Sequence, residues 1–408
     1  MDEIEIPSHF ICPISMQLMR DPVIVATGMT YDRESIEKWL YSCKNNICPM
    51  TKLELPTKDL TPNHTLRRLI QAWCMVNSSN GIERIPTPKP QVDKSQILKL
   101  INEAKRSAKV DDQIRCLKKL RSISQGSQSN KKCLEAAGAA DFLVELLIKK
   151  SSDEFDAIKE EAFNVLYHLD VSDSDLKKLV SDDKDSENFL ASLMQVLRWG
   201  DCQSRLNAIM LMKSAFNVAD PVQMMSCKVE VFVEIVRVLK DQVSPQASKA
   251  ALKLLMELCP WGRNRIKVVE AGAISTLIEI LIDNSEKRAC ELILTVLDQL
   301  CRIADGRAEL LAHGAGLAII SKKILRVSQV ASDRAVRIIS SVCKYSGTSR
   351  VLQEMLQVGV VAKLCLVLQV ENNSKILERV REILKLHSRS WKDSPCIPPS
   401  LISSYPLA

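Results

Sequence analysis

The sequence predicts a mainly α-helical protein: a small mixed β/α module at the N-terminus, followed by a solenoid of stacked helices. Three observations support this fold class. Hydrophobic residues make up 46% of the 408 residues and aromatic residues only 4%, so aliphatic side chains must build the core. A glycine ahead of an apolar helix recurs at intervals of 42 to 45 residues. The stretch from Phe10 to Trp73 lies outside this repeat and holds two Cys-Pro loops around one short helical segment.

The first half of the N-terminal module predicts a hairpin followed by a helix. Val23-Ile24-Val25 and Gly28-Met29 are typical of a small β-hairpin. Asp32 is placed to cap the N-terminus of the next helix. Three residues at i, i+3 and i+4 then form one apolar face of that helix: Ile36, Trp39 and Leu40.

The second half of the module predicts another helix, which begins around Thr61-Pro62-Asn63. Its apolar residues recur at i, i+3, i+4 and i+7. They are Leu66, Leu69, Ile70 and Trp73. We expect this face to close the module.

The two Cys-Pro loops have the outline of a RING finger without its metal ligands. A cross-brace zinc module needs paired Cys or His ligands for two tetrahedral sites. Cys12 is followed by Ser15, and Cys48 by Thr51, and a hydroxyl is a poor zinc ligand beside thiolate or imidazole. We therefore expect no metal and no cofactor, and we expect hydrogen bonds, ion pairs and core packing to hold the loops.

The rest of the chain predicts six helical units of roughly 42–49 residues. The clear copies carry Gly138, Gly272, Gly314 and Gly359, each ahead of an apolar run. Gly272 and Gly314 are 42 residues apart, Gly314 and Gly359 are 45 apart, and the 134 residues from Gly138 to Gly272 fit about three periods. Weaker copies begin at Asn188 and Val229.

The period and the glycine together favour armadillo repeats, with HEAT-like repeats as the main competitor. A left-handed glycine lets one helix stop and the next begin within two or three residues. Helices rich in Ala, Leu and Cys, such as 250–259 and 290–301, end at similar offsets in their repeats. Each unit buries its apolar face only against its neighbours, so the array forms one continuous superhelix.

Composition also indicates the cellular compartment of the protein and the classes of partner that it can bind. There is no run of about 18 apolar residues, and the acidic N-terminus lacks the apolar region of a signal peptide. The fourteen cysteines lack framework spacing, which is typical of reduced core thiols. The net charge of +7 is carried by residues 91–408 and favours a solvated helical face over a nucleic-acid groove. We expect a cytoplasmic protein, with nuclear and peripheral-membrane locations as further options, and no nucleic-acid partner.

The N-terminal residues resemble the U-box, the metal-free relative of the RING found in E3 ubiquitin ligases. The positions that agree in order are Cys12-Pro13-Ile14, Asp21-Pro22-Val23, Gly28, Thr30-Tyr31-Asp32-Arg33, Ile36, Trp39-Leu40, Cys48-Pro49, Thr51, Pro62-Asn63, Leu66 and Ile70. A U-box followed by armadillo repeats resembles the plant U-box armadillo E3 ligases over nearly the whole chain. The predicted domains are a U-box (8–77), a flexible Ser/Gly/Pro linker (78–94), an armadillo solenoid (95–391) and a Pro-rich tail (392–408).

The resemblance implies an enzyme that transfers ubiquitin without a covalent intermediate of its own. The U-box would recruit a ubiquitin-loaded E2 conjugating enzyme, and the armadillo repeats would hold the protein substrate. The implied physiology is plant defence or stress signalling, and homo- or heterodimers through the U-box are a further option. The non-catalytic alternative is an armadillo scaffold whose U-box only mediates association.

The resemblance also implies the E2-binding residues. They are Ile14, Val23, Trp39 and Pro49. The alternative to E2 contact is core packing for Ile14 and Trp39. For Pro49 the alternative is that it only fixes the turn of its loop. Lys52 falls where related ligases place a basic residue that bridges E2 and ubiquitin, although Lys lacks the planar fork of Arg and solvated lysine is the alternative.

Two other classes of function are weaker. A ligase that forms a thioester on Cys12, Cys43 or Cys48 would need an activating base, and the sequence places no His beside them. Nuclear import carriers use a repeated Trp-x-x-x-Asn pattern, and the fourth residues after the three solenoid tryptophans are Gln203, Arg265 and Pro395.

Overall fold

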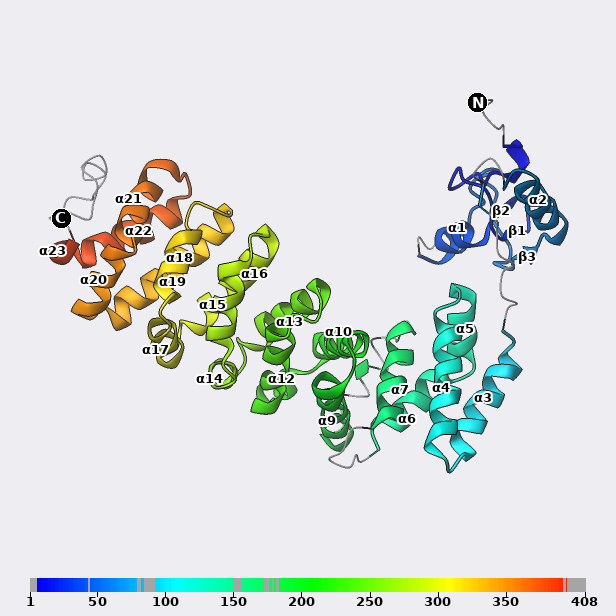
Figure 1. Ribbon diagram of the computed structural model, residues 1–408, viewed down its shortest axis with the longest axis horizontal. Helices are drawn as coiled ribbons and strands as arrows, with labels where there is room; N and C mark the ends of the chain where they lie inside the picture. Colours follow the sequence, from blue (N-terminus) through cyan, green and yellow to red (C-terminus); the bar gives the residue numbers. More distant parts are fainter. Residues whose placement is uncertain are drawn as a thin grey trace. The chain divides into compact units, whose positions relative to one another are not determined.

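The computed structural model describes residues 6–42, 45–78, 82–83, 92–149, 156–169, 171, 173, 176–177, 180, 183–391 and 394. Most of the predicted linker and nearly all of the predicted Pro-rich tail lie outside these residues. The chain divides into two compact units, residues 1–142 with 168–170, and residues 143–167 with 171–408. The N-terminal module and the helices that follow it are shown in Figure 1.

The N-terminal module contains a three-stranded antiparallel sheet of order β2-β1-β3. Strands β1 (Pro22–Ile24) and β2 (Thr30–Asp32) form the predicted hairpin, with Val23 opposite Tyr31. The turn needs Gly28, whose φ of +80° lies in the left-handed region. β3 (Thr61–Pro62) pairs with the other edge of β1, so the first two residues of the predicted helix start are a strand, and the helix starts with Asn63 as its N-cap.

The central helix combines α1 (Arg33–Glu37) with a π-helical turn, η2 (Lys38–Ser42). Ile36 and Leu40 are fully buried, as predicted, and Trp39 is partly buried against the same core. Asp32 occupies the N-cap position, but the prediction that its side chain caps the helix is wrong. Its carboxylate instead accepts the backbone N–H groups of Arg20 and Asp21, at 2.8 and 2.9 Å, which ties the loop before β1 to the helix.

The last helix of the module is α2 (His64–Val76), and a short 3₁₀ turn, η1 (Ser8–Phe10), lies at the other end. Asn63 caps α2 by accepting the N–H of Leu66 at 3.0 Å. Ile70 and Cys74 are buried, and Leu66 and Trp73 pack partly buried against the same core, so three of the four predicted residues belong to the closing face. Leu69 is 52% exposed, and the prediction that it belongs to this face is wrong. The closing face lies away from Leu69 because Cys74, one turn after Ile70, fills the core position.

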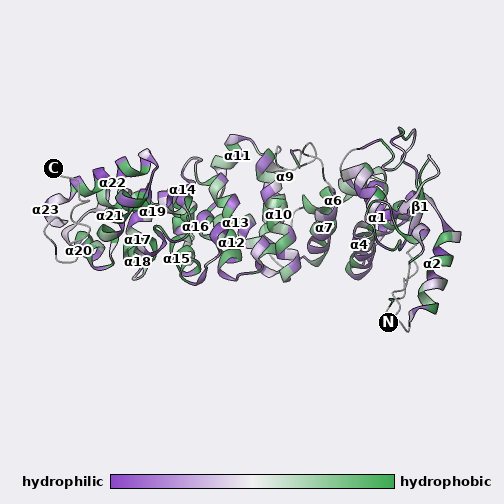
Figure 2. Cartoon of the chain, turned by 90° about the horizontal axis from the view of Figure 1, so that it is seen from above, coloured by the Kyte–Doolittle hydropathy of each residue, from purple (hydrophilic) through white to green (hydrophobic). Residues whose placement is uncertain are grey.

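The solenoid consists of short helices along which hydrophobic and hydrophilic residues are mixed (Figure 2). Two helices lead into it: α3 (Lys94–Arg106) and α4 (Val110–Ser124). The first helices of the repeats are α5 (Gln128–Ala136), α11 (Pro221–Ser226), α14 (Asn264–Glu270), α17 (Ala304–Ala312) and α20 (Ser349–Gln357). The second helices are α6 (Ala139–Leu147), α9 (Asp183–Trp199), α12 (Val229–Lys240), α15 (Ala273–Asp283), α18 (Gly316–Lys323) and α21 (Val360–Val370). The third helices are α7 (Ala157–His168), α10 (Cys202–Val218), α13 (Pro245–Leu258), α16 (Lys287–Leu300), α19 (Gln329–Ser346) and α22 (Ser374–Leu386), and α23 (Ser388–Trp391) ends the described array.

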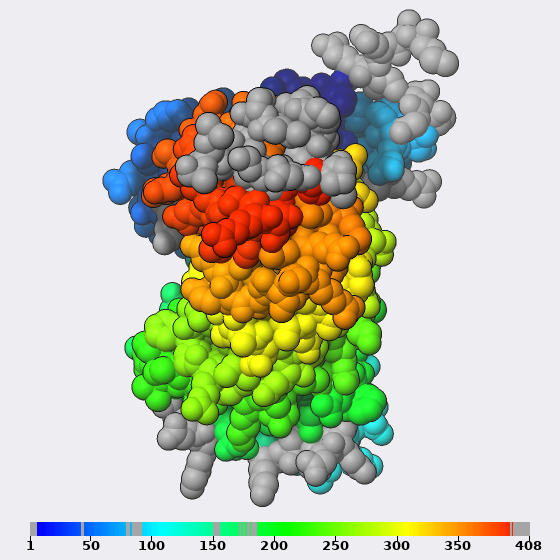
Figure 3. Space-filling view, turned by 90° about the vertical axis from the view of Figure 1, so that its left-hand side faces the viewer, coloured from blue at the N-terminus to red at the C-terminus, as the bar shows by residue number. Residues whose placement is uncertain are grey.

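Six second helices therefore stand at the six positions that the sequence repeat predicted. In the second unit α9, α12, α15, α18 and α21 pack in series, and α10, α13, α16, α19 and α22 form a parallel series. We call the latter series the third-helix face. Seen from the C-terminal end, the colours change in order from red through yellow to green, so successive repeats stack as layers (Figure 3). Leu, Ile, Val and Ala fill the interior, as the composition predicted.

The prediction of a left-handed glycine between two helices is confirmed in three of the four repeats on which it was based. Gly138, Gly272 and Gly359 have φ of +71°, +76° and +75° between their helices. Gly314 does not have a left-handed φ, so that part of the prediction is wrong. In this repeat Gly316 carries the constraint, because a Cβ there would lie 2.1 Å from the carbonyl oxygen of Leu310.

No single helix in the described part of the chain is long and apolar enough to cross a membrane. The bent pair α20 and α21 passes that test only by the combined length and composition of its two helices.

Candidate functional site

The two Cys-Pro loops of the N-terminal module are built alike. In the first loop Cys12 donates its N–H to Gln17 O at 2.8 Å, and Met16 donates to Cys12 O at 2.9 Å. In the second loop Cys48 donates to Leu53 O at 2.8 Å, and Lys52 donates to Cys48 O at 3.0 Å. Met16 and Lys52 both have left-handed φ, +54° and +59°. The same backbone hydrogen bonds therefore make two copies of one tight loop, as the shared sequence pattern suggested.

The thiol of Cys12 is an acceptor of hydrogen bonds inside the first loop. It is fully buried, and its Sγ lies 3.3 Å from the backbone N of Asp32. Burial acts to raise the pKa of this thiol, but hydrogen bonds from Ser15, Asp32 and Ile14 outweigh it and lower the pKa below its ordinary value. The sulfur thus fixes the first loop to the end of β2.

The thiol of Cys48 has the same role in the second loop. Tyr31 Oη lies 3.1 Å and Thr27 Oγ1 3.3 Å from its Sγ, and the side chain is fully buried. Burial acts to raise the pKa of the thiol, but hydrogen bonds from Thr27, Thr51 and Tyr31 prevail and lower it to about 6. The prediction that hydrogen bonds hold these loops is confirmed. Because Tyr31 and Asp32 are neighbours in β2, the two sulfur contacts also hold the two loops at the same end of that strand.

Ion pairs join the first loop to both helices of the module. Arg33 Nε lies 2.6 Å from Asp21 Oδ2, and Arg67 Nη1 of α2 lies 3.7 Å from Asp21 Oδ1. Arg33 also lies 3.9 Å from Glu37, and burial raises the pKa of Glu37. These side chains are mostly buried, so the pairs fix the loop against α1 and α2 more firmly than surface pairs would.

Three of the predicted E2-binding residues lie at the surface of this scaffold. Ile14 and Trp39 are partly buried against the core, and Pro49 is half-exposed on the second loop. Trp39 Nε1 donates to Ile47 O at 2.8 Å, which fixes the indole beside the second loop. Both interpretations of Ile14 and Trp39 from the sequence, core packing and a surface role, are compatible with half-buried side chains.

The fourth predicted residue, Val23, is fully buried in β1. Its side chain offers no surface to a partner, so its assignment to E2 binding is wrong. Val23 belongs to the same buried cluster as Tyr31, its partner in β2, and Ile36. Lys52, by contrast, is exposed at the left-handed position of the second loop.

Sequence reasoning missed several exposed apolar side chains of the two loops. Their exposed fractions are large for apolar residues: Met16 75%, Ile47 46%, Met50 54% and Leu53 61%. Their position next to a Cys-Pro pair was the feature of the sequence that could have identified them. Exposed apolar side chains gathered on two adjoining loops are typical of a protein-binding surface.

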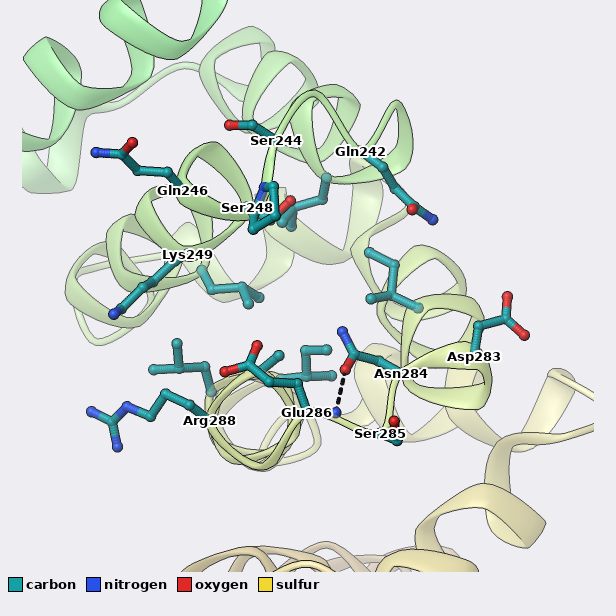
Figure 4. Close-up of a pocket in the computed structure, with 17 residues that line it drawn as sticks. Gln242, Ser244, Gln246, Ser248, Lys249, Asp283, Asn284, Ser285, Glu286 and Arg288 are labelled. Carbon is teal, nitrogen blue, oxygen red and sulfur yellow. Dashed lines mark hydrogen bonds between the residues drawn. The ribbon is translucent and has the colours of Figure 1, made fainter. Parts of the chain in front are cut away.

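The solenoid has a cleft of about 780 Å³ between α13 and α16. Its apolar lining includes Leu239, Leu252, Ile280, Leu292 and Ile293. Figure 4 shows Lys249 and Arg288 together on one side of this cleft and Asp283 on the other. We call it the α13–α16 cleft. An apolar floor with a charged rim is typical of a binding cleft.

Comparison with known proteins agrees with this architecture. A family model for the U-box domain matches residues 6–79, and one for the plant U-box protein ARM repeat region matches residues 96–407. A solved structure from work on a phosphorylation switch between cadherin and beta-catenin has a TM-score of 0.56 and 13% identity, covering 81% of this chain and 58% of that one. At that identity the likeness bears on the fold alone, and the fold is an armadillo solenoid.

The fold and the two loops define a U-box protein with armadillo repeats. Among known proteins of Arabidopsis thaliana, E3 ubiquitin-protein ligase PUB23 is 53% identical over 408 residues, covering 99% of this chain and 98% of its own length. E3 ubiquitin-protein ligase PUB22 is 49% identical over 434 residues, covering 99% of both chains. The chain belongs to the plant U-box armadillo family of E3 ubiquitin ligases, and it is a ubiquitin transferase of the U-box type.

Proposed function

We propose that the two loops and Trp39 bind a ubiquitin-loaded E2 and hold its thioester in a reactive geometry. In this reaction the amine of a substrate lysine attacks the thioester carbonyl, the E2 thiolate leaves, and an isopeptide bond forms. The ligase contributes position and orientation, not a covalent step. The exposed apolar side chains on two adjoining rigid loops carry this proposal, since they supply a preformed surface for a partner.

The ligase needs no nucleophile of its own. Cys12 and Cys48 are fully buried, and their sulfur atoms are hydrogen-bonded to Asp32 N and Tyr31 Oη of β2. A lowered thiol pKa without access to solvent serves the fold and not thioester exchange. Cys43 lies outside the described residues. Lys52, exposed beside Pro49, is the proposed bridge between E2 and ubiquitin.

The solenoid holds the protein substrate in this proposal, and the α13–α16 cleft is one candidate for the contact. The substrate would belong to plant defence or stress signalling, as the resemblance implies. Dimerisation through the U-box is also proposed, because α2 carries exposed apolar side chains on its outer side. They are Leu69 (52% exposed), Met75 (58%) and Val76 (78%).

The test compares chain formation by the wild-type protein and by Ile14→Ala, using E1, E2, ubiquitin and ATP. We expect at least about a tenfold loss of chains, because a few buried apolar contacts dominate small interfaces. Leu386→Ala is the matched control, a truncation of an exposed aliphatic side chain at the end of α22 that should leave chain formation unchanged. Circular dichroism checks that both variants stay folded. Full activity of Ile14→Ala would reject the assigned contact.

A further inference from the structure

Three arginines of the third-helix face surround one carboxylate. Asp298 of α16 is 4% exposed, and its Oδ2 lies 2.8 Å from Arg337 Nε and 3.1 Å from Arg334 Nη1, both on α19. Arg302, just after α16, has its Nη2 at 3.7 Å from the same oxygen. We call these four residues the arginine cluster. The contacts join two consecutive repeats, whose third helices pack side by side.

The arginine cluster has more positive charge and more donors than its carboxylate uses. Three guanidiniums against one carboxylate leave a local charge of +2. The side chains of Arg302, Arg334 and Arg337 are 46%, 30% and 29% exposed, so the unused charge faces solvent. Each guanidinium has five N–H donors in a fork that matches planar anions. Within the described part of the chain, the buried Nε of Arg334 has no hydrogen-bond partner.

Neighbouring ion pairs on this face are balanced. Arg379 of α22 lies 3.1 Å from Asp333, and Lys344 of α19 lies 3.0 Å from Glu382. Each of these contacts joins one cation to one anion across adjacent third helices. The excess is therefore local to the arginine cluster and is not a general property of the face.

We propose that the arginine cluster binds an anionic segment of the protein substrate, through carboxylate or phosphate-ester side chains. The proposal rests on the proposed substrate role of the solenoid. Charge complementarity selects the occupant, since three partly exposed guanidiniums carry two more positive charges than the one carboxylate between them. Arginine forks suit carboxylates and phosphates better than lysines do.

The same helix favours an extended peptide as the carrier of that anion. Arg288, at the rim of the α13–α16 cleft, and Asp298 are ten residues apart on α16, which is about 15 Å along a helix. About five residues of extended chain span that distance. A segment with acidic residues and one apolar side chain about five positions away would occupy both the arginine cluster and the α13–α16 cleft.

The test measures binding of fluorescein-labelled octapeptides to the full-length protein by fluorescence anisotropy. The probes are an all-glutamate peptide, a peptide alternating phosphoserine and glycine, and an all-glutamine peptide. The test variant is Arg334→Gln with Arg337→Gln. The matched control is Arg198→Gln with Arg237→Gln, because these two arginines lie 2.7 and 3.6 Å from the buried Glu234 on the second-helix series. Both double variants lose two positive charges, so net charge is equal.

We expect the glutamate or phosphoserine peptide to bind at least about fivefold more weakly to the Arg334/Arg337 variant, and less than about twofold more weakly to the control. The peptide that loses more identifies the anion. Asp298→Asn removes the one competing carboxylate and should tighten binding, an opposite change that misfolding would not produce. Equal weakening in both double variants, or no tightening with Asp298→Asn, would overturn the proposal.

Two further arms distinguish a peptide ligand from a lipid surface and from a nucleic acid. Vesicles with 30% phosphatidylserine and a 20-nucleotide single-stranded DNA replace the peptides, and dependence on Arg334 and Arg337 in those arms alone would reject a peptide ligand. Chain formation by the wild-type protein is measured separately. An absence of chains would reject the proposed role of the two loops in ubiquitin transfer. The peptide data would still show whether the arginine cluster binds anions.

Discussion

Replacing Tyr31 with Phe tests whether the sulfur-centred hydrogen bonds hold the second loop. The phenol of Tyr31 is fully buried and contacts Cys48 Sγ at 3.1 Å, and it accepts the N–H of Met50 at 3.2 Å. Tyr31→Phe keeps the ring and removes only the hydroxyl. The Met50 N–H then loses its partner, which costs about 1–3 kcal/mol, and a hydrogen bond to a charged group adds about 1.5–3 kcal/mol.

We expect a total loss of about 3 kcal/mol in the opening free energy of the module, or about a hundredfold faster amide exchange. Hydrogen exchange of the full-length protein, followed by mass spectrometry of peptides from residues 45–55, measures it. Tyr41→Phe is the matched control. Among the residues that the structure describes, the Tyr41 hydroxyl donates only to Lys58 O, at 3.3 Å, and contacts no thiol. Its loss should therefore cost less than about 1 kcal/mol.

The stability of the module should also depend on pH, and the pKa of Cys48 sets the direction of that dependence. Cys48 has a pKa of about 6 in the fold against an ordinary 9.0, so its thiolate contributes stability that is complete above pH 9 and is lost as pH falls through 6. Between those limits the wild-type module should gain up to about 1.4 kcal/mol per pH unit. Tyr31→Phe removes a donor to the thiolate and should flatten this slope. A cost below about 1 kcal/mol with an unchanged slope would refute the role given to the thiol.

Three other perturbations test the solenoid and α2. Gly272→Ala should lower the thermal midpoint through a left-handed strain of about 1–2 kcal/mol, whereas Gly314→Ala, without such a φ and with open space around it, should be neutral or slightly stabilising in the same scan. Glu234→Ala should lower the free energy of unfolding by about 2 kcal/mol. The loss is smaller than for a fully buried pair, because the two arginine partners of Glu234 can reach water. Urea unfolding measures this loss, and an unchanged stability would contradict the role of the contact. Leu69→Glu with Val76→Glu should shift the molar mass in light scattering from dimer to monomer, and a wild-type monomer would reject the proposed interface.

The sequence determined the elements whose signals are local. The six repeats, their aliphatic cores and the short loops at Gly138, Gly272 and Gly359 follow from periodicity and backbone preference, which neighbouring residues fix. The paired Cys-Pro loops were also visible, because the same spacing produces the same backbone hydrogen bonds twice. These features need only the chain within a few turns of each residue.

Only the tertiary structure decided which side of each element faces inward and which charges meet. Val23 lies in the core and Leu69 at the surface because strands and helices pack against partners far along the chain. The sulfur contacts of Cys48 bridge 17 and 21 residues, and Asp298 meets arginines 36 and 39 residues away. A sequence pattern does not encode such pairs, because the repeat spacing aligns helices but the superhelix selects which side chains lie opposite one another.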